Sequence, residues 1–243
     1  MNAPADMKPG ARLAGQDLRG ASLRGADLSD ACLRGADLSD ADLTAATLDR
    51  ADMRGALLCG ASLHGASLTD THLEGSNLVG ADLTAASFCS ADLAGASLCD
   101  TRLAGATFFE CAMPGVSLRG ASAPSADPAD GDPPLVAFVR CDLRGANLYA
   151  ACLHGSTLSG CDLRGAHLDS AILASSNLHY ALLAGASLRC TDLRGAVLHG
   201  ADLTGTNLRD AVVFDDDLSD VELRPDLDVD DDCAECAWYR RHS

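Results

Sequence analysis

Residues 21–50 read ASLRG ADLSD ACLRG ADLSD ADLTA ATLDR. Every fifth residue of this stretch, from Leu23 to Leu48, is leucine, and the residue two places before each leucine is alanine. The same pattern runs from Leu13 to Leu118 and again from Phe138 to Leu208, with an occasional Met or Phe in place of leucine. We call the leucine position of each repeat i. A strict short period of this kind indicates a repeat architecture.

A period of five fits neither the period of a helix nor the alternation of a flat strand. Positions i−2 and i are separated by one residue, so both side chains can point inward from a short extended segment. The rest of the repeat then turns a corner. Of the 23 glycines, 21 lie at i+2, all except Gly10 and Gly131, as expected for a corner that needs a positive φ.

A second, longer period of four repeats indicates how many sides one turn of the chain has. When the repeats are counted in fours from Leu13, position i+2 of the fourth repeat is never glycine: Asp30, Arg50, Asp70, Ser90, Glu110, Ala150, Ser170, Cys190 and Asp210. The other three corners are mostly glycine. The sequence therefore predicts four sides in each coil.

With this motif, A-(D/N/S)-L-x-G, residues 11 to about 215 resemble the pentapeptide-repeat family. The resemblance implies an all-β fold, a right-handed quadrilateral β-helix with i−2 and i inside and the other positions outside. The 22 repeats before the gap and the 16 after it, with Val213 counted as the last, make nine to ten coils. At about 4.8 Å per stacked strand, the solenoid is roughly 45–50 Å long. Phe88 and Phe108 are four repeats apart and should stack.

The composition divides the chain into five parts: an N-terminal lead-in at 1–10, a first repeat block at 11–120, a Pro- and Asp-rich insert at 121–135, a second repeat block at 136–224 that frays after 215, and an acidic tail with a C-terminal segment at 225–243. The insert is as long as three repeats. It either covers three sides of a coil as degenerate repeats, which we favour, or loops out at one corner and leaves the later faces rotated by one side.

The net charge and the positions of the cysteines limit the possible partners and the compartment of the protein. The net charge is −17: residues 1–12 contribute +1, residues 13–120 contribute −7, residues 121–135 contribute −3, residues 136–214 contribute nothing, and residues 215–243 contribute −8. Such a chain repels nucleic acids and membrane surfaces and favours basic partners. The lead-in at 1–10 holds no hydrophobic signal region, and the 11 cysteines mostly occupy ordinary repeat positions. We therefore expect reduced thiols in a cytoplasmic protein, with Cys141 and Cys161 in adjacent coils.

No catalytic set stands out, because Ser, His and Asp recur throughout the repeats and a regular wall offers no deep pocket. We expect no enzymatic activity, no cofactor and no metal site. Cys233 and Cys236 form a lone CxxC pair, whereas structural zinc needs four ligands. Trp238 and Tyr239 lie in the only segment with tryptophan and are candidates for an end cap or a dimer contact, which leaves a monomer or a homodimer through the C-terminal end.

Acidic residues suggest the partner surface. On the predicted solenoid, one line of acids follows the edge between the fourth and first sides: Asp30, Asp52, Asp70, Asp92 and Glu110. A second line runs down the third side, partly neutralised by Arg24, Arg144 and Arg164: Asp42, Asp82, Asp142, Asp162 and Asp202. The insert adds Asp127, Asp130 and Asp132.

The Qnr-type and MfpA-type members of the family, which this chain resembles more distantly, imply an acidic DNA mimic that binds a type II topoisomerase, gyrase, and protects it from inhibitors, a route to antibiotic resistance. The first repeat block carries one net charge per roughly 3.4 Å, about half the density of B-DNA. The alternative is a scaffold or adaptor that docks a protein partner by shape. In either case the chain is expected to bind a protein rather than nucleic acid or membrane.

Overall fold

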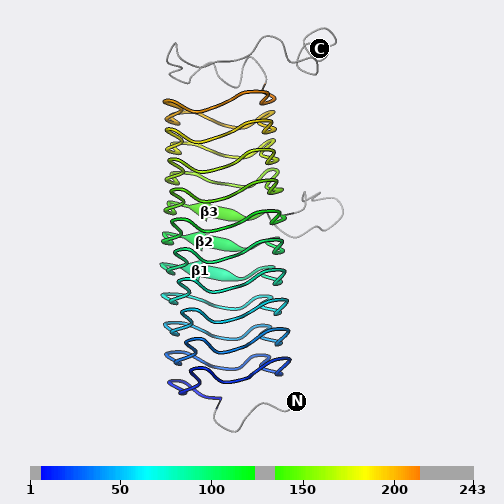
Figure 1. The fold of residues 1–243 in the computed structure, drawn as a ribbon, viewed down its shortest axis with the longest axis vertical. Helices are drawn as coiled ribbons and strands as arrows, with labels where there is room; N and C mark the ends of the chain where they lie inside the picture. The colour runs from blue at the N-terminus through cyan, green and yellow to red at the C-terminus, as the bar shows by residue number, and fades with distance from the viewer. Residues whose placement is uncertain (1–6, 124–134, 214–243) are drawn as a thin grey trace.

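The computed structural model describes residues 7–123 and 135–213, which form a solenoid of stacked, four-sided coils (Figure 1). Residues at i−1 pair in parallel with the equivalent residue four repeats later, as Asp17 does with Asp37. Three such pairings lengthen into strands, β1 (Ser87–Cys89), β2 (Thr107–Phe109) and β3 (Ala137–Val139), in the order β1-β2-β3. The predicted all-β solenoid with four sides per coil is confirmed.

We number the four faces of the solenoid in chain order. In the first block, face 1 includes residues 51–53, face 2 includes 56–58, face 3 includes 61–63 and face 4 includes 66–68, and each face recurs every fourth repeat. Strands β1, β2 and β3 all lie on face 4. Adjacent faces meet at corners that turn at positions i+1 and i+2, and we count the outward residues at i−1 and i+1 with the face that they flank.

Each repeat satisfies its backbone in the same way. The Leu33 N–H donates to the carbonyl of Asp52 in the next coil at 2.7 Å, and the Asp52 N–H donates to the carbonyl of Ala31 at 2.9 Å. The corner closes when the Ala36 N–H donates to the Leu33 carbonyl at 3.0 Å. Position i+2 has a positive φ at 22 glycines and at 16 residues of other types in the described chain. Gly10 is one of these glycines, so the corner pattern begins one repeat earlier than the sequence suggested.

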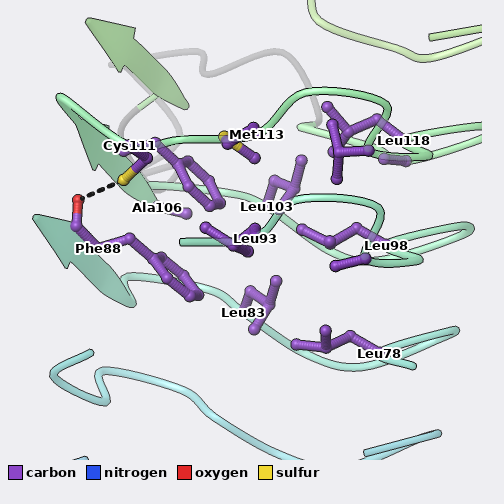
Figure 2. Close-up of a cluster of buried hydrophobic side chains, with 14 of the residues drawn as sticks. Leu78, Leu83, Phe88, Leu93, Leu98, Leu103, Ala106, Cys111, Met113 and Leu118 are labelled. Atoms are coloured by element: carbon purple, nitrogen blue, oxygen red, sulfur yellow. Dashed lines mark hydrogen bonds between the residues drawn. The ribbon is translucent and has the colours of Figure 1, made fainter. Parts of the chain in front are cut away.

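The interior is a set of leucine columns, fully buried along most of their length (Figure 2). On face 4 the column changes to aromatic. The rings of Phe88 and Phe108 stack with centroids 4.5 Å apart, as predicted, and Phe138 continues the stack at 4.7 Å. The participation of Phe138 was not predicted, because it follows Phe108 by six repeat lengths rather than four.

Three cysteines stack on the inner side of face 1, at Cys111, Cys141 and Cys161. Each thiol donates to a phenylalanine carbonyl: Cys111 to Phe88 at 3.4 Å (Figure 2), Cys141 to Phe108 at 3.3 Å and Cys161 to Phe138 at 3.4 Å. The contact with Cys141 and burial raise the pKa of Cys111 and Cys161, so these thiols stay protonated. All nine cysteines of the described residues are free.

The pairing offset changes across the insert, which corrects both readings of residues 121–135. Ser122 pairs with Arg102, four repeat lengths before it, and with Cys152, six repeat lengths after it. Ala121 and Ala123 therefore remain in the wall as part of a regular repeat, and the chain is longer by two repeat lengths than a coil requires before Val136 re-enters. Among the described residues, 121–123 supply one of the three possible repeats, and the sequence from Val136 on is shifted by two sides.

This shift changes which corners lie above one another. The corner of Glu110 continues into Arg140, not Ala150, because the Glu110 N–H donates to the Val139 carbonyl at 3.0 Å. The glycine-free series in the sequence therefore occupies two opposite corners. The corner between faces 1 and 2 is instead glycine in every coil: Gly15, Gly35, Gly55, Gly75, Gly95, Gly115, Gly145, Gly165, Gly185 and Gly205.

Candidate protein-binding surfaces

Aspartate at i−1 acts first as a cap for its own repeat. The Ala94 N–H donates to Asp92 Oδ1 at 3.0 Å, and the Thr84 N–H donates to Asp82 Oδ1 at 3.0 Å. A side chain that accepts from the backbone of the second residue after it forms an Asx turn, and it orders the entry into each corner. The structure thus gives these carboxylates a local role in repeats that read A-D-L.

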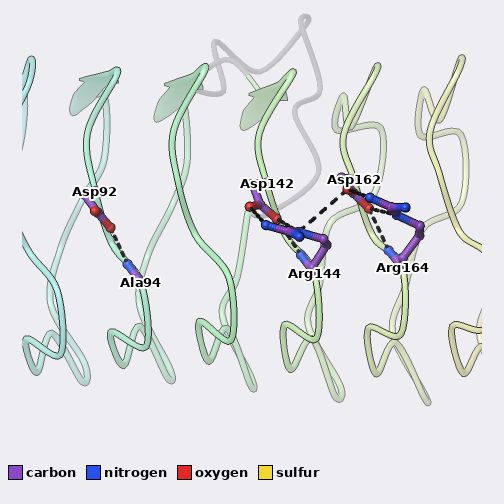
Figure 3. Close-up of polar contacts among 6 residues, drawn as sticks. All are labelled: Asp92, Ala94, Asp142, Arg144, Asp162 and Arg164. Carbon is purple, nitrogen blue, oxygen red and sulfur yellow. Dashed lines mark hydrogen bonds and ion pairs between the residues drawn. The ribbon is translucent and has the colours of Figure 1, made fainter.

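Where arginine follows at i+1, the same carboxylate also binds the guanidinium. Asp142 accepts from Arg144 Nε at 2.8 Å and from its terminal nitrogen at 2.6 Å, and Arg164 binds Asp162 in the same way (Figure 3). Arg144 Nε also lies 3.8 Å from Asp162 of the next coil. The hydrogen bond from Arg144 lowers the pKa of Asp142. These acids are neutralised within the wall and offer little net charge to a partner.

The second predicted acidic line is wrong, because of the two-side shift at the insert. Asp42 and Asp82 lie on face 3, whereas Asp142 and Asp162 lie on face 1, in the same column as Asp92. Figure 3 shows Asp92, Asp142 and Asp162 along one face. Asp202 follows them on face 1, where its carboxylate caps Thr204 at 2.9 Å.

The predicted edge acids lie along the corner between faces 4 and 1, but most of them are paired. Asp30 forms two hydrogen bonds to Arg50, each of 2.8 Å, and Asp52 lies 2.6 Å from Arg54. Glu110 lies 3.1 Å from Arg140. Within the described residues, Asp70 and Asp92 make no salt bridge. The line of acids also ends at Glu110, because Arg140, Gly160, Tyr180 and Gly200 continue this corner.

An excess of negative charge remains in the first coils of face 4 and its corner. Asp27, Asp30, Asp49 and Asp70 surround one guanidinium, that of Arg50, whose pKa is raised by its hydrogen bond to Asp30 and by the charges of Asp49 and Asp70. We call these four carboxylates the acidic corner. Asp49 accepts from the Ser67 hydroxyl at 2.6 Å and from the Thr69 N–H at 3.1 Å, so part of the cluster is held in place.

A second surface feature, which the sequence reasoning missed, lies on the same corner near residue 200. The rings of His179 and Tyr180 meet edge to face at 4.2 Å, and His199 lies 5.0 Å from His179. Tyr180 is 59% exposed, and a Cβ on Gly200 would meet its ring, so the ring lies over that glycine. The available signal was a tyrosine at a corner position, with a glycine at the same corner four repeats later.

The remaining predictions receive less structural information. The insert acids and the C-terminal candidates lie outside the described residues: Asp127, Asp130, Asp132, Cys233, Cys236, Trp238 and Tyr239. Within residues 7–123 and 135–213, no group of three or more His, Cys, Asp or Glu side chains is placed to hold a metal ion. Over the same parts of the chain, no helix has the length and apolar character needed to cross a membrane.

Comparison with known proteins places the fold in a family. A model of pentapeptide repeats matches residues 10–44, 36–75, 66–105, 137–165, 151–189 and 176–212. HetL, a pentapeptide repeat protein involved in heterocyst differentiation regulation from the cyanobacterium Nostoc sp. strain PCC 7120, is 34% identical, with a TM-score of 0.72 over 84% of this chain and 87% of HetL.

QnrB1, a plasmid-mediated fluoroquinolone resistance protein, shares the fold at 21% identity, with a TM-score of 0.58 over 77% of this chain and 93% of QnrB1. No curated protein matches the sequence at a significant level. The family model covers well over half of the chain, within the coils described above. The chain belongs to the pentapeptide repeat family.

Proposed function

We propose that this protein is a non-enzymatic binding solenoid that uses its acidic corner to dock a basic surface of a protein partner. The observation that carries the proposal is the arrangement of Asp27, Asp30, Asp49 and Asp70 around the single cation of Arg50. Four carboxylates and one guanidinium leave three net negative charges within three coils. A patch of one sign attracts an oppositely charged partner and orients it during encounter.

Type II topoisomerase is the first partner to test. The family resemblance suggests it, and a basic DNA-binding groove would suit an acidic surface. The proposed contact is local, because the Asp142 and Asp162 carboxylates are paired with arginines and the corner beyond Glu110 holds no acids in the described residues. Docking of the first coils is therefore the proposal, rather than mimicry of DNA along the whole solenoid. A scaffold or adaptor with an unrelated partner is the competing function.

The test is a gyrase supercoiling assay with the purified protein, with and without a fluoroquinolone, at two salt concentrations. We expect inhibition or protection that weakens as salt rises, because screening acts on exposed charges. The triple variant Asp27→Asn/Asp49→Asn/Asp70→Asn should need at least a tenfold higher concentration than the natural protein for the same effect on gyrase. Asparagine keeps an acceptor oxygen for the neighbouring hydroxyl and N–H groups, so the local fold is preserved.

The matched control is Asp142→Asn/Asp162→Asn, which removes charge from carboxylates that already bind Arg144 and Arg164. We expect this control to act like the natural protein. If gyrase is unaffected at micromolar protein, topoisomerase is excluded as the partner, and affinity capture at low and high salt then decides between a basic partner and a salt-tolerant scaffold contact.

A further inference from the structure

Face 4 differs from the other three faces because it carries no formal charge over most of its length. Each coil presents two outward side chains on this face, at positions i−1 and i+1. In the seven successive coils from Ser67 to His199, none of these side chains is Asp, Glu, Lys or Arg. Faces 1, 2 and 3 each carry both acids and arginines in the same coils, for example the acids Asp92, Asp169 and Asp192. In a chain of net charge −17, an uncharged strip of this length is unusual.

The strip is also partly apolar and has exposed large side chains. Phe109, in β2 near its middle, is 41% exposed, and Val139 follows in β3. Val197 is 48% exposed, and Tyr180 borders the same end of the strip. The three short strands make this the most regular part of the wall, so the side chains project from a fixed, flat backbone.

We propose that face 4 is the interface of a homodimer in which two solenoids pack face to face and antiparallel. Two chains of net charge −17 repel each other, so a stable contact between copies needs a surface without charge. A two-fold axis perpendicular to the solenoid axis, passing between β2 and β3, places Phe109 against Val139 of the second copy. Such an interface is isologous, because the same patch serves both copies.

This arrangement makes the borders of the strip complementary as well. At the corner between faces 4 and 1, the axis places Glu110 at the level of Arg140 of the second copy, and Asp70 at the level of Tyr180. The acidic end of each chain therefore lies beside the His and Tyr end of the other. A parallel arrangement does not do this, because its two-fold axis would run along the solenoid and would set the corner between faces 4 and 1 of each copy beside the corner between faces 3 and 4 of the other.

The size of the strip sets the strength of the contact. The proposed axis leaves three coils of the strip on one side and four on the other, so six coils overlap. At about 4.8 Å each, they give a height of roughly 29 Å, and one extended segment gives a width of roughly 10 Å. With the corner side chains, about 1,000 Å² in total would be buried, at the lower limit for specific interfaces. We therefore expect a dimer that forms at roughly 10–100 µM and dissociates on dilution.

The test is sedimentation velocity of the full chain over a concentration series at low and high salt. The dimer should strengthen with salt, because screening weakens the repulsion between like-charged copies, whereas binding of a basic partner should weaken. Phe109→Asp should shift the midpoint concentration at least tenfold upward. The matched control is Leu57→Asp, which places the same charge at an apolar side chain of equal 41% exposure on face 2 and should leave the midpoint unchanged.

A cysteine cross-link tests the antiparallel register. The proposed axis places the natural Cys89 opposite residue 159 of the second copy, across faces about 10 Å apart, which is too far for a disulfide. Ser159→Cys should therefore give a covalent dimer with a short bis-maleimide reagent, whose cross-linked peptides contain positions 89 and 159. Ser97→Cys, on face 2, should not. A chain that stays monomeric at several hundred micromolar overturns the proposal, and so does a dimer that resists Phe109→Asp, as one joined through the C-terminal end would.

Discussion

At the scale of single residues, the corner determines most of the local energetics. Every corner of the described solenoid places position i+2 in the left-handed backbone region, but 16 of these positions are not glycine. An L-residue with a Cβ pays roughly 1 kcal/mol or more for this conformation. The fold tolerates this because backbone hydrogen bonds close the corners and a buried small residue and leucine follow in the next repeat.

Substitution in either direction at this position should show that cost. At Gly95, with φ of 64°, a Cβ would meet open space, so Gly95→Ala should destabilise the protein by about 1 kcal/mol through backbone conformation alone. The reverse change, Ala85→Gly at φ of 58°, should be neutral or stabilising by up to about 1 kcal/mol. Urea denaturation measures both changes, and equal destabilisation by the two substitutions would contradict this explanation.

At the scale of the repeat, the Asp-Leu-Arg unit links stability to pH. Asp192 binds Arg194 at 2.6 Å, and this hydrogen bond lowers the pKa of Asp192 in the folded state. A carboxyl with a lowered folded pKa contributes stability above its unfolded pKa of about 3.9 and loses that contribution as pH falls through the folded value. Asp52, Asp142 and Asp162 have the same pKa direction and the same cause.

We therefore expect Arg194→Gln to lower the melting temperature by about 1–3 °C at pH 7 and by progressively less as pH falls below about 3.9, because partly exposed ion pairs contribute about 0.2–1 kcal/mol. Arg189→Gln is the control, since the Arg189 guanidinium makes no salt bridge within the described residues. Melting curves followed by circular dichroism from neutral to acidic pH measure both variants. If Arg194→Gln lowered the melting temperature by the same amount at every pH, the effect would come from packing of the aliphatic part of the Arg194 side chain instead.

The aromatic column is a local interruption of the leucine core. Phe108 stacks between two rings, whereas Phe138 stacks against one. Stacked aromatic pairs contribute about 0.5–1.5 kcal/mol beyond burial, so Phe108→Leu should cost about 1 kcal/mol more than Phe138→Leu. Urea denaturation of the two variants tests this, with Leu98→Ala as a measure of ordinary core truncation, about 2–5 kcal/mol. Equal costs for the two Phe→Leu variants would show that stacking adds nothing to filling the column.

At the scale of the whole molecule, the repeat pattern predicted the four-sided coil and the inward residues because backbone pairing and burial both follow the period of five. The relation between the two blocks was not predicted. The glycine-free series kept its four-repeat spacing across the insert and suggested continuous faces, but non-glycine corners tolerate many residue types and do not report register. The invariant corner from Gly15 to Gly115, continued from Gly145 to Gly205, was the better signal.

The surfaces were harder to predict than the core for the same reason. Inward positions depend only on the repeat, whereas an outward line of residues depends on which repeats lie above one another. A shift of two sides moved Asp142 and Asp162 from the predicted line to the opposite face and brought Phe138 onto Phe108. The pairing of Asp30 with Arg50 and of Glu110 with Arg140 likewise depends on contacts between coils.

The two-side shift itself can be tested by shortening the chain between the blocks. Deleting residues 125–134 and changing Leu135→Gly would join Ala123 to Val136 through Pro124 and a glycine, the residues that a type II turn favours at its two central positions. This variant removes two repeat lengths, the excess over one coil, so face 4 stays continuous and Phe138 still stacks on Phe108. We expect a melting temperature within a few degrees of the natural protein, since loop length changes closure entropy slowly.

The control deletion removes residues 121–135, one repeat length more, and joins Gly120 directly to Val136. The second block would then turn by one side relative to the first, so Phe138 would leave the aromatic column and Arg140 would leave Glu110. Loss of the stacked contacts and of the matched glycine corner should lower stability by a few kcal/mol, measured by urea denaturation. If instead the longer deletion were the more stable variant, all 15 residues would form a loop outside the wall at one corner, and the pairing offset of six repeat lengths would be refuted.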